Sequence, residues 1–255
     1  MNVIALAKWV PNPAGTPEMG PDNRLKRQGA EGALDPGDEP SIEQALRLVE
    51  QSEGEVTVVS MGPEVATEAI RKALSMGCHK GIQITDEALA GADILVTARV
   101  LAAAIKRQEF DLVLTAVEST DGYTGTLPQT LAEFLGVPSL AFAKKVELTD
   151  GKLRVERQTE TGYEVVECEL PAVVAVTAGA TEPRYPTLKG IMQAKQKPLE
   201  KVAVSDLGLS EDDTKPTQEV VGLESAPERG AGEIVEDADE ATQKIVSLLK
   251  EAKVI

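Results

Sequence analysis

The chain has 255 residues and carries 42 acidic and 26 basic side chains, for a formal net charge of −16 at pH 7. This acidic balance argues against sequence-independent binding of nucleic acid, because such affinity comes from Lys and Arg side chains that neutralise phosphates. No apolar run is long enough to span a bilayer, and Lys8 interrupts the first one before it could act as a signal sequence, so we expect a cytoplasmic protein without membrane insertion.

The first half of the chain alternates short apolar runs with helical patterns. Continuous apolar runs predict buried strands, and apolar residues three and four positions apart predict helices. In chain order we expect a strand at 3–7, a loop rich in Gly, Pro and charge at 11–40, a helix near 41–49, a strand at 56–59, a helix at 65–77, a strand at 81–84, a helix near 92–107, a strand at 110–115 and a helix near 131–135. This alternation predicts an α/β fold with a doubly wound, mostly parallel sheet.

After Pro138 the pattern changes. Alternating runs at 144–148, 152–158 and 163–170, separated by Asp150-Gly151 and Thr161-Gly162, predict a small antiparallel β meander at about 144–171. An apolar strand at 173–176 follows, and residues 205–233 are acidic and nearly aperiodic before an amphipathic helix near 238–250. We therefore divide the chain into a domain at 1–204 and an extended C-terminal arm with its helix at 205–255. That arm can pack on a partner or back on its own domain.

Residues for side-chain catalysis are scarce. Cys78 and Cys168 are too few for a disulfide framework and lack metal-ligand spacing. The single histidine, His79, lies between a predicted helix and a predicted strand, and we interpret it as a loop residue. A Ser-His-Asp triad would need this one histidine, and a His-rich metal site is excluded. We therefore expect no catalytic residue and no metal site.

The predicted sheet itself points to a binding site, because open doubly wound sheets bind ligands outside the carboxyl ends of their strands. Lys8, just after the first strand, can approach a phosphate or be a solvated surface residue. Residues 118–128, rich in Gly, Ser and Thr, can offer N–H groups and a helix N-terminus to an anion, or can form an ordinary capped loop. Residues 35–39 can contact a ribose or cap the next helix. The strand ends that mark the candidate pocket are residues 7–9, 60–62 and 116–118.

Residues 181–195 form a second unusual segment, which turns through two prolines and becomes a short basic helix in an acidic protein. In one interpretation Leu188 and Ile191 face the core. In the other, Leu188 projects as an apolar anchor for a partner's pocket, ringed by Arg184, Lys189 and Lys195.

Several stretches resemble the β subunit of electron transfer flavoprotein. They are residues 7–11 (AKWVP), the region 111–138 around Asp121-Gly122, and residues 182–188 (EPRYPTL) followed by 191–195 (IMQAK). The resemblance covers essentially the whole chain, and the proline-flanked run is highly specific to this family. It implies an adenine nucleotide α-hydrolase-like α/β fold, and an obligate heterodimer with an α subunit that holds most of the FAD and on which the C-terminal arm packs.

The resemblance also implies a function without side-chain catalysis. The heterodimer of this family carries electrons from acyl-CoA and related flavin-dependent dehydrogenases to a membrane-bound quinone oxidoreductase, and its β subunit buries a structural AMP. The residues that match its dehydrogenase-docking loop are Arg184, Tyr185, Leu188, Ile191 and Met192. The residues that match its AMP contacts are Leu6, Ala7, Lys8, Asp35, Pro36, Gly37, Asp38, Glu39, Met61, Ala116, Val117, Glu118, Ser119, Thr120, Asp121, Gly122, Tyr123, Thr124, Gly125, Thr126 and Leu127.

Two departures from the family pattern leave alternatives open. Gln158 stands where many relatives have a glutamate implicated in orienting the mobile flavin domain. Residues 121–125 partly resemble the loop of bifurcating members, which bind a second FAD in β, but residues 126–129 differ from that form and favour AMP. The remaining interpretations are a stand-alone adenine-nucleotide sensor and a nucleotide hydrolase that uses Asp121 or Glu118.

Overall fold

The computed structural model of the protein describes residues 1–149, 151–224 and 232–255. They form two compact units, Met1–Val221 and Gly222–Ile255. Asp150, the first residue of a predicted hairpin turn, lies outside the described residues, as does the part of the predicted acidic arm at 225–231. None of the described helices is long and apolar enough to cross a membrane.

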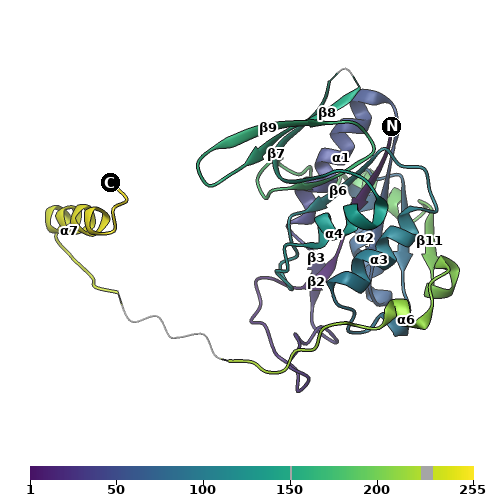
Figure 1. The fold of residues 1–255 in the computed structure, drawn as a ribbon, viewed down its shortest axis with the longest axis horizontal. Coiled ribbons are helices and arrows are strands. Elements are labelled where there is room, and N and C mark those ends of the chain that lie inside the picture. The colour runs from purple at the N-terminus through teal and green to yellow at the C-terminus, as the bar shows by residue number, and fades with distance from the viewer. Residues whose placement is uncertain (150, 225–231) are drawn as a thin grey trace. The chain divides into compact units, whose positions relative to one another are not determined.

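The first unit is built on a nine-stranded sheet with the strand order β11-β5-β4-β1-β6-β10-β7-β8-β9 (Figure 1). All pairs from β11 to β7 are parallel, and β7, β8 and β9 form the antiparallel meander. The structure therefore confirms the predicted fold class. The strands are β1 (Asn2–Leu6), β4 (Glu55–Met61), β5 (Lys80–Ile84), β6 (Leu112–Ala116), β7 (Ser139–Thr149), β8 (Lys152–Gln158), β9 (Tyr163–Cys168), β10 (Ala172–Val176) and β11 (Leu199–Val202).

Helices cover both faces of this sheet. Val3 and Ala5 of β1 pack in one apolar cluster, whereas Ile4 packs in the other. Because both faces are covered, β1 is apolar from Val3 to Leu6 instead of alternating. The first cluster includes α1 (Asp38–Ser52), α2 (Thr67–Met76) and α5 (Leu188–Ala194), and the second includes α3 (Ile94–Ile105) and α4 (Leu127–Leu135).

A short ribbon of β2 (Trp9–Pro11) and β3 (Gly32–Leu34) occupies part of the segment predicted as loop. Trp9 pairs with Leu34, so the chain returns to the carboxyl end of β1 before α1 begins. A Cβ at Gly32 would overlap the Trp9 ring, which explains a glycine here. The ribbon was not predicted, because two three-residue strands separated by twenty residues leave no local periodic pattern.

Short helices also occur where the sequence predicts an aperiodic arm. Residues Val204–Leu207 form a 3₁₀ turn and α6 covers Glu211–Thr214. In the second unit, α7 (Ala238–Glu251) confirms the predicted C-terminal helix, and the Asp237 side chain caps it by accepting from the N–H groups of Asp239 at 3.0 Å and Glu240 at 2.8 Å. Packing of this helix on a partner stays a prediction.

Candidate functional site

The candidate site lies where the strand order changes direction. The chain passes from β1 to β4 on one side and returns with β6 on the other side of β1. The carboxyl ends of β1 and β6 therefore flank a topological switch point, the place at which open α/β sheets bind their ligands. Lys8 follows β1, and residues 117–126 connect β6 to α4.

Asp121 is the centre of a charged cluster at this point. The side chain of Asp121 is 3% exposed, and its two oxygens accept from Lys8 Nζ at 2.6 Å and from Arg27 Nε at 2.7 Å. Lys8 Nζ also donates to Ser119 Oγ at 3.1 Å. Burial by itself would raise the pKa of Asp121, but the two cations outweigh burial and lower it. A carboxylate held ionised in this way is a poor general base, which counts against a hydrolase that uses Asp121.

Asp35 ties three loops of the site together. This carboxylate is fully buried, and its Oδ2 accepts from Thr120 N at 2.7 Å and from Thr120 Oγ1 at 3.2 Å. Its Oδ1 accepts from Gly37 N at 2.9 Å, and its own N–H donates to Lys8 O at 2.9 Å. Asp35 thus holds the segments after β1, β3 and β6 against one another.

Asp38, at the start of α1, is a buried carboxyl in a different electrostatic state. Its Oδ2 accepts from Lys8 N at 2.7 Å. Burial raises the pKa of Asp38 well above its usual range, and the nearby Asp35 carboxylate raises it further, whereas the bond from Lys8 N and the lysine charge only partly offset these effects. The site therefore combines a carboxylate kept charged at Asp121 with a carboxyl at Asp38 that favours its protonated form.

We expect Asp38→Asn to stabilise the protein at pH 8. Below the ordinary pKa of aspartate both the folded and the unfolded state keep the proton. As the pH rises, the unfolded chain ionises first while the folded state retains its proton, so the native carboxyl loses stability. The amide removes this loss while its oxygen still accepts from Lys8 N. If the free energy of unfolding increases by an amount on the order of 1 kcal/mol, the Tm of the heterodimer should rise by about 2–4 °C at pH 8 and by less at pH 5. An equal change in Tm at both pH values, or a lower Tm, would contradict the raised pKa of Asp38.

The other predicted contacts are distributed around this cluster. Leu6 and Ala7 point into opposite core clusters, so only their backbone can meet a ligand. Met61 packs against the core cluster that includes α3. Glu39 lines a groove of about 710 Å³ together with Trp9 and residues of α2 and α5. Exposed residues are Pro36, Glu118, Gly122, Tyr123, Thr124 and Thr126, and half-buried ones are Gly37, Ala116, Val117, Ser119, Thr120, Gly125 and Leu127.

The N-terminus of α4 fits an anion beside this cluster. Thr126 is the N-cap residue of α4 but makes no side-chain hydrogen bond to the helix. The first turn offers the N–H groups of Leu127 and Gln129, but none from Pro128, together with the positive end of the helix dipole. Gly125 precedes it with φ +63°, a conformation that glycine adopts without strain. Together with Lys8, these groups form a donor set that suits a phosphate.

The second predicted surface, residues 181–195, is exposed. Tyr185, Leu188 and Met192 are 90, 83 and 73% exposed, and Ile191 is 47% exposed. The interpretation in which Leu188 and Ile191 face the core is therefore wrong, and Ala194 is the residue of α5 that is buried. Arg184 is half-buried and binds carboxylates of α1.

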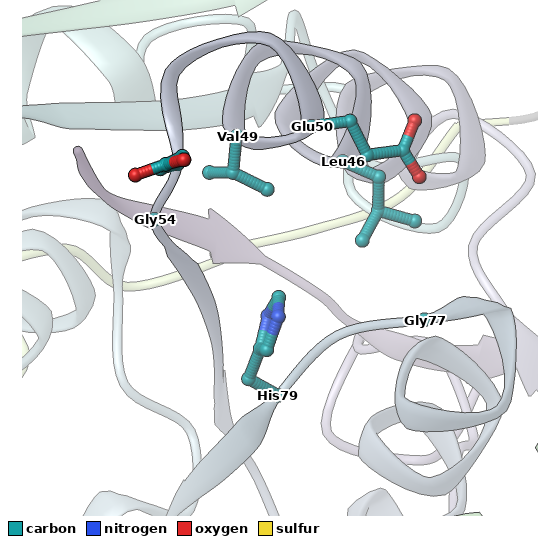
Figure 2. Close-up of a pocket in the computed structure, with 7 residues that line it drawn as sticks. Leu46, Val49, Glu50, Gly54, Gly77 and His79 are labelled. Atoms are coloured by element: carbon teal, nitrogen blue, oxygen red, sulfur yellow. The ribbon is translucent and has the colours of Figure 1, made fainter.

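A cavity of about 290 Å³ lies at the opposite, amino-terminal edge of the strands (Figure 2). His79 points into it from the residues before β5, below Val49 of α1. His79 Nδ1 accepts from Val56 N at 2.9 Å, and burial lowers the pKa of this imidazole. These contacts confirm His79 as a loop residue and give it a structural task, since it joins its loop to β4.

Sequence reasoning missed two parts of this arrangement. Arg27 lies in the aperiodic segment before β3, where no pattern distinguishes it from other surface cations. Glu43 and Glu50 both bind Arg184. Their spacing of seven residues places them on one face of a helix, so this pair of carboxylates was detectable.

Comparison with known proteins matches the chain to one protein family. The sequence matches the family described as electron transfer flavoprotein domain over residues 22–207. It is similar to the electron transfer flavoprotein subunit beta of Mycobacterium bovis, with 38% identity over 264 residues that cover 100% of this chain and 99% of the relative. The subunit beta of Bacillus subtilis is 37% identical over 235 residues, 91% of each chain. The caffeyl-CoA reductase-Etf complex subunit CarD of Acetobacterium woodii is 34% identical over 266 residues, 100% of each chain.

Proposed function

The chain belongs to the electron transfer flavoprotein family as a β subunit, and from this premise we propose that it carries electrons from flavin-dependent dehydrogenases, such as acyl-CoA dehydrogenases, toward a quinone oxidoreductase. A β subunit of this family is an electron-carrier subunit and implies an α subunit as its partner. On this proposal the pair acts in fatty acid oxidation in the bacterial cytoplasm.

AMP is the ligand that we propose for the site beside Lys8 and Asp121 at the carboxyl ends of β1 and β6, with FAD enclosed at the boundary with the α subunit and held mainly by α. The juxtaposition of Lys8, Asp121 and the uncapped N-terminus of α4 carries this proposal. Lys8 and the first turn of α4 hold the phosphate, while Asp35 keeps the surrounding loops in place. When bound, FAD supplies the electron-accepting chemistry, whereas AMP supplies none.

The exposed Leu188 supports the docking part of the proposal. A large apolar side chain at the surface of a short helix, with the charged Lys189 and Lys195 near it in sequence, suits a transient partner. The apolar contact orients the dehydrogenase, and the charges around it aid the encounter and limit the lifetime of the complex. Neither role needs a proton-transferring side chain.

One alternative stays open within the family. Residues 121–125 partly resemble the loop of bifurcating members, so the site can instead hold a second FAD. A full-length relative is named as part of a caffeyl-CoA reductase-Etf complex, and the partner dehydrogenase of this chain can likewise be one that acts on another acyl-CoA. A stand-alone nucleotide sensor predicts instead an isolated chain that exchanges nucleotide reversibly and binds no α subunit.

Co-expression with the α subunit tests the proposed function. The purified pair should be yellow, and its flavin absorbance should fall when a catalytic amount of acyl-CoA dehydrogenase and its acyl-CoA substrate are added. Omitting either of these should leave the spectrum unchanged. A colourless pair, or a flavin that several acyl-CoA dehydrogenases fail to reduce although dithionite does, would contradict the proposal.

A further inference from the structure

The segment at 181–195 presents exposed side chains although it contains little regular structure of its own. Its only helix, α5, has seven residues. A helix this short is not stable in isolation, because nucleation is unfavourable and few hydrogen bonds follow it. The conformation of Tyr185, Leu188 and Met192 must therefore depend on contacts with the rest of the first unit.

The first attachment is formed by Arg184, which binds two carboxylates of α1. Its Nε donates to Glu43 Oε2 at 2.7 Å, and its Nη1 donates to Glu50 Oε1 at 2.6 Å. Its Nη2 donates to both residues, at 3.2 and 3.1 Å, and its backbone N–H donates to Glu43 Oε2 at 3.2 Å. Every nitrogen of the guanidinium thus binds α1, in the forked geometry that makes Arg–carboxylate pairs strong and directional.

Glu43 is the buried half of this attachment. Its side chain is 3% exposed, and Arg47 Nε donates to its other oxygen at 2.7 Å. Burial by itself would raise the pKa of Glu43, but the hydrogen bonds from Arg184 and Arg47 outweigh it, so the pKa is lowered. The carboxylate therefore stays charged at neutral pH. Arg47 extends the attachment, since its Nη2 donates to Glu182 O at 3.2 Å.

The second attachment holds α5 against α2. Arg71 Nη1 donates to Ala194 O at 2.5 Å, at the end of α5. A Cβ at Gly190 would lie 2.5 Å from Ser75 O, so the backbones approach too closely for any other residue. The exposed residues 185–192 are therefore fixed at both ends, to α1 by Arg184 and to α2 by the packing of α5.

We propose that Arg184 is a positioning residue for docking, which with Glu43 and Glu50 holds residues 185–192 in their binding conformation before a partner arrives. This inference rests on the proposed docking role of Leu188. A segment that is already ordered loses less conformational entropy when it binds, so its attachment increases affinity without touching the partner. The guanidinium acts through the loop, because each of its three nitrogens donates to a carboxylate of α1.

The test compares Arg184→Gln with wild type in the complete heterodimer. We expect the KM for the heterodimer in the dehydrogenase reaction to rise about fivefold to tenfold while kcat is unchanged, because only binding is affected. Arg184→Lys should recover part of this loss, since one ammonium cannot form the fork. Arg107→Gln is the matched control: Arg107 Nη2 donates to Glu200 at 2.9 Å in an exposed pair, and its loss should leave KM unchanged.

Amide hydrogen exchange gives a readout that does not depend on the dehydrogenase. Exchange should accelerate within residues 185–192 of Arg184→Gln and stay as in wild type in the β1 and β6 core. Glu50→Gln removes one of the two carboxylates at a more exposed position and should cause the same changes to a smaller extent. If Arg184→Gln does not fold, Glu50→Gln replaces it as the test variant.

A double-mutant cycle with Leu188→Ala separates this proposal from the docking role itself. We expect Arg184→Gln to raise KM in the wild-type background and to add little in the Leu188→Ala background. If Leu188→Ala raises KM and Arg184→Gln does not, the positioning role is wrong and docking stands. If neither variant changes KM, the positioning role of Arg184 and the docking role of Leu188 are both wrong. Additive effects, or faster exchange throughout the protein, would make Arg184 a general structural residue and overturn the proposal.

Discussion

Asp35→Ala should destabilise the protein and empty the nucleotide site together. The substitution removes the acceptors of Thr120 N and Gly37 N, and both donors lie in the tightly packed loops of the site. A hydrogen bond from one of these half-buried donors to a charged group contributes about 1.5–3 kcal/mol. We expect a loss of roughly 3 kcal/mol, or a Tm lower by about 6–12 °C, measured by thermal unfolding of the heterodimer. Because the Asp35 side chain joins the loop after β3 to the loop after β6, the purified variant should retain at most about a tenth of the wild-type nucleotide, a loss of ~1.4 kcal/mol or more in binding.

Two control variants distinguish the loss of the Asp35 hydrogen bonds from a general effect of removing a carboxylate. Asp35→Asn keeps one oxygen acceptor and should show an intermediate loss. Asp206→Ala removes an exposed carboxylate that accepts from Ala203 N at 2.9 Å, and it should change Tm and nucleotide content little. Wild-type nucleotide content in Asp35→Ala would show that the loops keep their arrangement without this carboxylate.

Leu188→Ala should weaken electron transfer from the dehydrogenase without changing the nucleotide or flavin content. The side chain is 83% exposed, so its removal leaves no cavity and should change Tm by less than about 1 °C. An apolar anchor at the centre of an interface contributes about 2 kcal/mol or more to binding, which corresponds to a rise of about 30-fold in KM. Steady-state reduction of the heterodimer by acyl-CoA dehydrogenase at increasing heterodimer concentration measures this change.

A loss of apolar surface elsewhere should have no such effect. Leu188→Met keeps a large apolar side chain and should retain most of the affinity. Val65, which is 50% exposed in the 3₁₀ turn Glu64–Ala66, offers a matched control, because Val65→Ala removes apolar surface outside the docking segment. An unchanged KM in Leu188→Ala, or an equal rise in Val65→Ala, would show that this leucine is not the anchor.

The parallel core was predictable because each of its elements carries its own local pattern. β1, β4 and β6 are short runs of mainly apolar, largely buried residues, and the helices between them have apolar residues at helical spacing. The rule that ligands lie at the carboxyl ends of such strands then brought Lys8 and Asp121 to one place, and the structure joins them at 2.6 Å. The fold thus follows from periodicity and topology, which also predict that Lys8 and the loop with Asp121 meet, whereas a nucleotide at this place stays a prediction that rests on the family resemblance.

The remaining features depend on contacts that no local pattern encodes. Pairing of β2 with β3 brings together Trp9 and Leu34 across a long loop, and that loop also delivers Arg27 to Asp121. The protonation preference of Asp38 follows mainly from its burial, which the sequence does not show, and from Asp35, which lies three residues before it. The attachment of Arg184 to Glu43 links residues 141 positions apart. Such features become predictable only once the fold is known.

Nucleotide analysis of the co-purified heterodimer tests the central claim most directly, because the claim assigns the site beside Lys8 and Asp121 to AMP. Heat-denatured protein would release its nucleotides for chromatographic separation and for quantification against the protein concentration. A structural AMP in β and FAD held mainly by α predict close to one of each per heterodimer. Two FAD and no AMP would assign the site to a second flavin, and FAD with no adenine nucleotide besides it would contradict the account.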